Sequence, residues 1–308
     1  MSRFNISPDL NPSILSPLLS DMPVREALFR RVLFPTDFSS YADAVLDCVK
    51  DLRGLREIVL LNSIDTRMHL SLGVEILSQR AKSELVKLEE PLRYRGVIVR
   101  SLIKAGIPWQ EITKTADEED ASLILMGARG VSLFREMFLG TTTSDVVRNS
   151  NRPVLIVRFK LVEKLGKIEC ERVCQDLLGK ILFATDFSEQ SQRALGLLET
   201  LKESGANELV LVHVVDRGET EEEAQALRAA AEKELMGVEH ELGEDGWRVR
   251  SIATVGIASK EIISIANAEN ASLIAVGARG KGVIEGLLVG STAEAVARRA
   301  DRPVLILR

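Results

Sequence analysis

Short apolar runs alternate along this chain with longer amphipathic stretches. Most runs are continuous in Val, Ile and Leu, as in parallel strands that are covered on both faces. The longer stretches repeat apolar residues at the spacing of helices. The first half is predicted to contain strands at 31–35, 58–64, 97–104, 123–126 and 153–157 and helices at 39–52, 76–94, 109–118 and 142–149. Pro91 is expected to kink the second of these helices or to end it early.

The second half repeats the same order of elements. Its predicted strands lie at 180–184, 209–215, 248–254, 273–276 and 303–307. Its first predicted helix starts at 188, and three further helices span 220–242, 259–269 and 292–299. Alternation of strands and helices with right-handed crossovers predicts an α/β fold. We expect two tandem doubly wound, open, parallel five-stranded sheets of the Rossmann-like type.

Sequence identity between the halves indicates a duplicated domain. LFPTDFSS at 33–40 returns as LFATDFSE at 182–189, and ASLILMGARG at 121–130 returns as ASLIAVGARG at 271–280. RPVLI occurs at 152–156 and again at 302–306. The offset of about 150 residues is far above the 20–50 residues of repeat arrays.

The duplication divides the chain into four expected segments. Residues 1–30 form an extension with several prolines, expected as a loose arm ending in a short helix at 24–30. The two copies occupy 31–158 and 179–308. Residues 159–178 form an amphipathic linker, for which a helix is one candidate form.

Composition and charge exclude several classes of protein. With 40 basic and 45 acidic residues the net charge is −5, which argues against a surface dedicated to nucleic acid or to an anionic membrane. No run of 18 uncharged apolar residues suggests a membrane span, and the first residues lack a secretory signal pattern. Three cysteines are too few for a disulfide framework, so we expect a cytoplasmic protein. The C-x3-C pair of Cys170 and Cys174 is weak evidence for a metal, and none is expected.

Candidate chemistry lies where strands end and strand order reverses, which is where open α/β sheets bind ligands. Asp37 follows the first strand of copy one, and Asp186 holds the same place in copy two. A glycine pattern, Gly-x2-Gly-x9-Gly followed by a hydroxyl residue, comes after the fourth strand of each copy. It consists of Gly127, Gly130, Gly140 and Thr141 in copy one and of Gly277, Gly280, Gly290 and Ser291 in copy two.

This glycine pattern favours phosphate binding over simple turns. Glycine allows the backbone to approach an anion closely and permits positive φ angles. Gly140 and Gly290 stand directly before a helix, whose first amides have no internal partner and whose dipole favours negative charge. Thr142 and Thr292 add further hydroxyl donors at the same ends.

The sequence resembles the universal stress protein family in its tandem-domain form. The resemblance is carried by PTDFS and ATDFS, by LVHVVD at 211–216, by the two glycine patterns and by the RPVLI ends, and it covers most of 31–158 and 179–308. It implies an adenine-nucleotide alpha hydrolase-like fold and a site for ATP or another adenine nucleotide in each copy, with Mg²⁺ as a candidate companion of the phosphates.

The resemblance also assigns roles to residues. Asp37 and Asp186 would contact ribose, and the backbone at Ser63 and Val214 would meet adenine. The phosphates would lie on Gly127, Gly130, Gly140, Thr141 and Thr142 in copy one and on Gly277, Gly280, Gly290, Ser291 and Thr292 in copy two. Copy one departs from the pattern in having Asn62-Ser63 where copy two has His213-Val214.

Other residues in these segments leave alternatives open. Arg129 and Arg279 could pair with a β- or γ-phosphate, or could be solvated loop arginines. His213 is expected to be a packed, hydrogen-bonded histidine rather than a catalytic one. The absence of G-x4-GK[ST] excludes a Walker-type NTPase.

Three functions fit these observations. The first is an adenine-nucleotide binding protein with a stress-response or regulatory role. The second is a slow ATP-hydrolysing or adenylating enzyme on the same fold, and the third is a protein-interaction module. Because the last strand of each copy would be an exposed apolar edge, we expect the copies to pair as an internal pseudo-dimer, with a homodimer of whole chains as a further candidate.

Overall fold

The computed structural model describes residues 27–49, 53–68, 71–128, 139–158, 160–164, 167–171, 177–216, 218, 220–280 and 288–308. Copy one contains β1 (Arg31–Pro35), α2 (Ser40–Val49), β2 (Glu57–Asp65), α3 (Ser71–Tyr94), β3 (Ile98–Gly106), α4 (Pro108–Glu118), β4 (Leu123–Gly127), α5 (Thr141–Asn149) and β5 (Val154–Val157).

Copy two repeats this series of elements. It contains β8 (Ile181–Ala184), α6 (Glu189–Glu199), the 3₁₀ helix η1 (Thr200–Ser204), β9 (Glu208–Val215), α7 (Glu221–Glu244), β10 (Arg248–Val255), α8 (Ala258–Ala268), β11 (Leu273–Gly277), α9 (Ser291–Arg299) and β12 (Val304–Leu307). Every predicted strand and helix of the two copies is present, with shifted ends. Pro91 lies within α3, which continues to Tyr94 instead of ending early.

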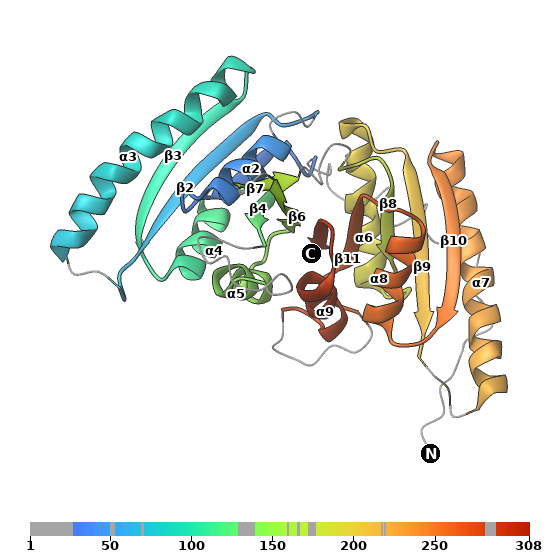
Figure 1. Ribbon diagram of the computed structural model, residues 1–308. Coiled ribbons are helices and arrows are strands. Elements are labelled where there is room, and N and C mark those ends of the chain that lie inside the picture. Colours follow the sequence, from blue (N-terminus) through green and yellow to red (C-terminus); the bar gives the residue numbers. More distant parts are fainter. Residues whose placement is uncertain are drawn as a thin grey trace.

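All ten of these strands form one continuous sheet, in the order β10-β9-β8-β11-β12-β5-β4-β1-β2-β3 (Figure 1). Within each copy every pair is parallel, and the chain runs outward from β1 to β3 before β4 and β5 fill the other side. The strand order therefore reverses between β1 and β4, and likewise between β8 and β11. The α/β fold with Rossmann-like topology is confirmed, with the two predicted sheets joined into one.

The sheet is covered on both faces, which explains its continuous apolar strands. One buried cluster joins alternate strand residues such as Phe34 and Leu60 to α2 and α3. The other joins Leu33 and Leu61 to α4 and α5. The same division recurs in copy two, with α6 and α7 on the first face and α8 and α9 on the second.

The two copies meet through β5 and β12, which pair antiparallel. Val304 lies opposite Ile156, and Ile306 lies opposite Val154. This pairing covers the apolar edge that each copy would otherwise expose. The expected internal pseudo-dimer is therefore confirmed in the form of a shared sheet.

Reciprocal arginines reinforce this junction. Arg158, after β5, donates to the carbonyl oxygens of Ala297 and Arg298 near the end of α9, the latter at 3.1 Å. Arg308, after β12, donates to Val147 O of α5 at 2.5 Å. Each copy thus places a cation on carbonyls in the last turn of the other copy's helix, where the helix dipole favours positive charge.

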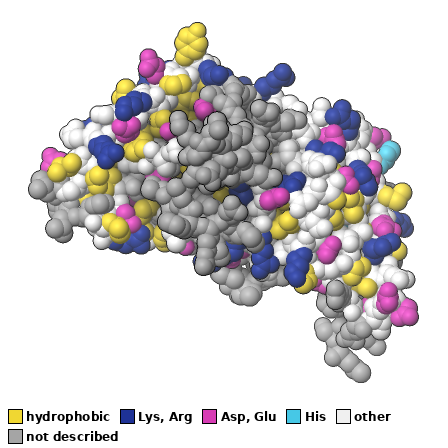
Figure 2. Space-filling view, in the orientation of Figure 1, with side chains coloured by type: hydrophobic (Ala, Val, Ile, Leu, Met, Phe, Trp, Pro, Cys, Tyr) yellow, Lys and Arg dark blue, Asp and Glu magenta, His cyan; other side chains and the backbone are white. Residues whose placement is uncertain are grey.

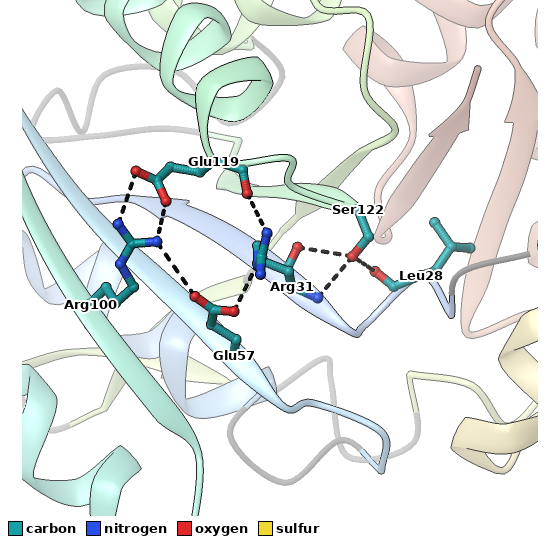
Figure 3. Close-up of polar contacts among 6 residues, drawn as sticks. All are labelled: Leu28, Arg31, Glu57, Arg100, Glu119 and Ser122. Atoms are coloured by element: carbon teal, nitrogen blue, oxygen red, sulfur yellow. Dashed lines mark hydrogen bonds and ion pairs between the residues drawn. The ribbon is translucent and has the colours of Figure 1, made fainter.

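A polar network at the amino ends of the strands recurs in both copies. In copy one Arg31 Nε lies 2.7 Å from Glu57, Arg100 lies 2.5 Å from Glu119, and Ser122 Oγ accepts from the Arg31 amide at 3.0 Å (Figure 3). Copy two has Lys180 beside Glu208, Arg250 beside Glu269, and Ser272 beside the Lys180 amide. Because ligands of such sheets bind at the carboxyl ends, this network is structural.

The structure corrects two expectations for segments outside the copies. Lys160–Lys164 (β6) and Lys167–Glu171 (β7) form an antiparallel hairpin, so a helical linker is wrong for these residues. Their short segments contain β-branched Val162 and Ile168, which favour strands. Residues 27–30 form a turn in which Arg30 N donates to Ala27 O, instead of the end of a helix. Residues 1–26 and Cys174 lie outside the described residues.

Within the described parts of the chain, no helix is long and apolar enough to cross a membrane. On the face seen in Figure 2, basic and acidic side chains are interspersed over both copies.

The capping role of Arg308 predicts a loss of stability when its guanidinium group is removed. Arg308→Met keeps much of the apolar stem but leaves Val147 O without this donor, so we expect the free energy of unfolding to fall by about 1–2 kcal/mol. Urea denaturation measures this change. Arg299→Met, at an exposed position on α9, is the control and should change stability by less than about 0.5 kcal/mol. Equal effects of the two variants would contradict the capping role.

Candidate functional site

The candidate site of each copy lies at the carboxyl ends of two adjacent parallel strands. In copy one these are β1 and β4, and in copy two they are β8 and β11. Asp37 and Asp186 follow the first strand of each pair, and Gly127 and Gly277 end the second. The sequence prediction that these residues converge at the switch point is supported by this strand order.

A strained turn positions each aspartate. Phe38 and Phe187 have φ angles of 59° and 58°, in the left-handed region that costs bulky residues about 1–3 kcal/mol. Both rings pack against the core of their copy, which compensates for part of this cost. The turn places each carboxylate beside the following serine, with Asp37 Oδ1 accepting from Ser39 N at 3.1 Å and from Ser39 Oγ at 2.6 Å.

The same arrangement orients Asp186 in copy two. Its Oδ1 accepts from Ser188 N at 3.1 Å and from Ser188 Oγ at 2.6 Å, while Ser188 Oγ accepts from Ser191 N and caps α6. One carboxylate oxygen is therefore committed to fixing the start of a helix. The other, Oδ2, is directed at the glycine loop.

Gly280 shows why the loop requires glycine. A Cβ atom at this position would lie 2.2 Å from Asp186 Oδ2, well inside the contact distance of any two atoms. The described site glycines do not use the positive φ angles that glycine permits, since the φ values of Gly140 and Gly290 are −59° and −79°. The glycines serve close approach between loop and carboxylate.

The helices that follow the glycine loops begin without a side-chain cap. Gly140 and Gly290 are the N-cap residues of α5 and α9, and neither helix has a side-chain hydrogen bond at its cap. The Gly140 amide donates to Ala128 O at 2.8 Å, and the Gly290 amide donates to Ala278 O at 2.7 Å. These bonds tie each helix start to the end of its strand.

The first-turn amides of α5 and α9 are consequently available to an anion. They belong to Thr141 and Thr142 in copy one and to Ser291 and Thr292 in copy two, and all four residues are exposed or partly exposed. In contrast, the starts of α6 and α7 are capped by Ser188 and Thr220. Helices α4 and α8 also begin without a side-chain cap, after Ile107 and Ile257. What marks α5 and α9 as the helices suited to a ligand is the glycine at each N-cap, tied to the end of β4 or β11 beside the aspartate loop.

Among the described residues near the loop of copy two, the acidic Glu294 is neutralised and two cations, Arg279 and Arg308, lie close together. Glu294, in the first turn of α9, is neutralised by Arg148 at 2.5 Å and Arg298 at 2.8 Å, and the hydrogen bond from Arg148 holds its pKa below the usual range. Burial, together with the nearby charge of Arg279, lowers the pKa of Arg308 to about 10. An anion beside Arg279 would relieve this repulsion.

Ser63 and Val214 offer main-chain groups at the same edge. In a parallel ladder, the N–H and C=O of one residue point to the same neighbour, and alternate residues point to opposite neighbours. Thr36 N donates to Leu61 O and Thr185 N donates to Val212 O, so residues two further along face the same side. There β1 and β8 have already ended, at Pro35 and Ala184.

The residues preceding these two positions hold the aspartate loops. Asn62 Nδ2 donates to Thr36 O at 2.9 Å, and His213 Nδ1 lies 2.8 Å from Thr185 O. Because a carbonyl can only accept, Nδ1 carries the proton. His213 also stacks on Phe187, with ring centroids 4.5 Å apart. The expectation of a packed, hydrogen-bonded histidine is confirmed.

Some of the predicted site residues cannot be placed, and others were missed. Arg129 and Gly130 lie outside the described residues, whereas Arg279 is exposed, two residues beyond the end of β11. The missed residues are Ser39 and Ser188, which orient the aspartates and could be recognised from the duplicated D-F-S sequence. In the part of the chain that the structure describes, no group of three metal-ligating side chains gathers.

The fold and the two loops define a tandem Rossmann-like protein with one candidate anion site in each half. Residues 28–158 and 178–308 match the model of the universal stress protein family. The match covers both copies, so the chain belongs to this family.

Similar proteins include some that match less than half of this chain and some that match most of it. The universal stress protein MJ0577 of Methanocaldococcus jannaschii is 33% identical over 157 residues, covering 43% of this chain and 97% of the relative. Universal stress protein Slr1230 of Synechocystis is 25% identical over 239 residues, covering 75% and 72%. A universal stress protein structure from Archaeoglobus fulgidus has 28% identity and a TM-score of 0.67, covering 90% of this chain and 96% of that one.

The contact between Gly280 and Asp186 predicts opposite effects for two Gly→Ala substitutions. Gly280→Ala must displace the carboxylate that holds Ser188, so we expect a loss of about 0.5–2 kcal/mol of stability. Gly237→Ala in α7, where a Cβ meets nothing within 4 Å, should add about 0.5–1 kcal/mol. Thermal or urea unfolding of both variants measures these changes. A stabilising Gly280→Ala would show that the loop is looser than described.

Proposed function

We propose that each copy binds one adenine nucleotide, ATP or a related form, and that the chain is a nucleotide-binding stress-response or regulatory protein. The observation that carries this proposal is the duplicated uncapped helix start, at Gly140 and at Gly290, beside a strand end and an oriented aspartate. In the universal stress protein family this glycine pattern marks the members that bind ATP or related nucleotides.

The phosphates would occupy the starts of α5 and α9. The first-turn amides and the hydroxyls of Thr141 and Ser291 would donate to phosphate oxygens, and the helix dipole would favour their charge. In copy two, Arg279 would pair with the outer phosphates. The close approach required of Gly280 supports a loop shaped for contacts with the backbone.

The ribose and the base would lie toward β1 and β2 in copy one and toward β8 and β9 in copy two. Asp37 and Asp186 are oriented by the serines that follow them, and a carboxylate has enough lone pairs to accept a ribose hydroxyl as well. The main-chain groups of Ser63 and Val214 face the side where the neighbouring strand has ended, and they would meet the edge of adenine.

Mg²⁺ would accompany the phosphates rather than occupy a protein cage. Mg²⁺ is usually held by one or two carboxylates, by waters and by substrate phosphates. The described residues include no cluster of three ligating side chains, which fits an ion that arrives with the nucleotide. It would neutralise phosphate charge when bound.

Nucleotide titration tests the proposal most directly. We expect a stoichiometry near two by isothermal titration calorimetry with ATP. Gly140→Leu or Gly290→Leu should each remove one site, because a bulky side chain at the N-cap blocks the anion from the first-turn amides. Gly237→Leu on α7 is the control and should retain both sites. Absence of binding by the unaltered chain would favour a protein-interaction module instead.

Turnover separates a binding protein from an enzyme. The carboxylates near the loops already have partners, since Asp37 and Asp186 accept hydrogen bonds from serines and Glu294 is paired with arginines. No general base is therefore apparent among the described residues of the loops. We expect ATP hydrolysis well below about 1 s⁻¹, the lower end of typical enzymes. Phosphate release at or above this rate would assign the chain to the enzyme class.

A further inference from the structure

Ser63 carries a buried hydroxyl without a hydrogen-bond partner among the described residues. The side chain projects from the same face of β2 as Val59 and Leu61, which pack toward α4 and α5. Leaving a buried hydroxyl unpaired is unfavourable, because the group loses its hydrogen bonds to water and gains none in return. The neighbouring Asn62 shows the usual solution, because its amide donates to Thr36 O.

Copy two does not carry this cost. Val214 occupies the equivalent position and packs against the apolar cluster of the same face. The fold therefore accepts an apolar side chain at this position. The strand does not need the hydroxyl of Ser63 in order to form. Ser63 lies near the carboxyl end of β2, and its own main-chain groups are those proposed above to meet the base.

We propose that Ser63 is a specificity-determining residue of the copy-one site, and that its hydroxyl hydrogen-bonds the polar edge of the adenine ring. This inference rests on the proposed function. Ser63 is partly exposed as a residue, and in this proposal its hydroxyl rotates to another staggered side-chain position when the ligand binds. A hydroxyl donates and accepts, which suits an edge that presents both an amino group and ring nitrogens.

The two sites are consequently inequivalent. Copy one recognises the base through a side chain as well as the backbone, whereas copy two presents the methyl groups of Val214 to the base. Sites built around a polar group discriminate against ligands that cannot pair with it, because the group would then stay buried and unpaired. Copy one should be the more selective of the two sites.

The test measures ATP binding at copy one in a Gly290→Leu background, where the copy-two site is removed. Ser63→Val, which installs the copy-two side chain, should weaken ATP binding about tenfold, the equivalent of one good hydrogen bond. Ser63→Thr, which keeps a hydroxyl, should retain most of the affinity. Inorganic tripolyphosphate, which has no base, should bind Ser63→Val as it binds the parent.

Stability of the free protein gives a second, independent readout. Removing an unpaired buried hydroxyl should leave the thermal midpoint of Ser63→Val unchanged or raised, so weaker ATP binding cannot be ascribed to unfolding. Equal ATP affinity in Ser63→Val and its parent, or an equal loss for tripolyphosphate, would overturn the role of Ser63 while leaving the proposed function intact. Failure of the unaltered chain to bind ATP at all would overturn both.

Discussion

The antiparallel pairing of β5 with β12 is the interaction on which the rest of the molecule depends. It converts two half-sheets, each with an apolar edge, into a single ten-stranded sheet. It also brings α5 and α9 together, so that Arg148 pairs with Glu294. Arg158 donates to the last turn of α9, and Arg308 donates to the last turn of α5. Since these helices also begin at the two glycine loops, the junction holds one end of each helix while its other end faces a candidate ligand. The strand pair therefore fixes how these helices meet, while each candidate site is built within one copy, where two adjacent parallel strands end.

Much of this fold could be predicted because its signals are local and duplicated. Continuous apolar runs such as 58–64 identify strands buried on both faces. Because the sequence is duplicated, each element predicted in one copy can be compared with its equivalent in the other. The linker could not be predicted in this way. Its amphipathic composition fits a helix or a strand, and β6 finds its partner only in the next segment of the chain, β7. Similarly, the presence of Pro91 did not reveal whether the helix would continue past it. Proline removes one helical hydrogen bond, but the packing of the neighbouring residues determines whether the helix ends there.

The positions of the candidate site residues could be predicted better than the contacts that these residues make. The positions of Asp37 and Gly140 follow from counting along the repeat, since both come directly after or before a regular element. The reason for glycine at 280 could not be found in this way, because it depends on how closely a loop approaches the carboxylate of Asp186. The buried hydroxyl of Ser63 is likewise invisible in sequence, because serine is ordinarily a surface residue. Only the packing of β2 between its helices reveals it.

Closure of the central edge leaves β3 and β10 as the outer strands of the sheet. Both carry cations along their length, including Arg100 and Lys104 on β3 and Arg248 and Arg250 on β10. Each of these side chains is held in an ion pair with a carboxylate. Charged side chains on an edge strand are a common protection against pairing with the edge of another molecule. A second molecule could add a strand to either outer edge only by accommodating these paired charges, a requirement that the apolar strands at the centre of the sheet do not impose.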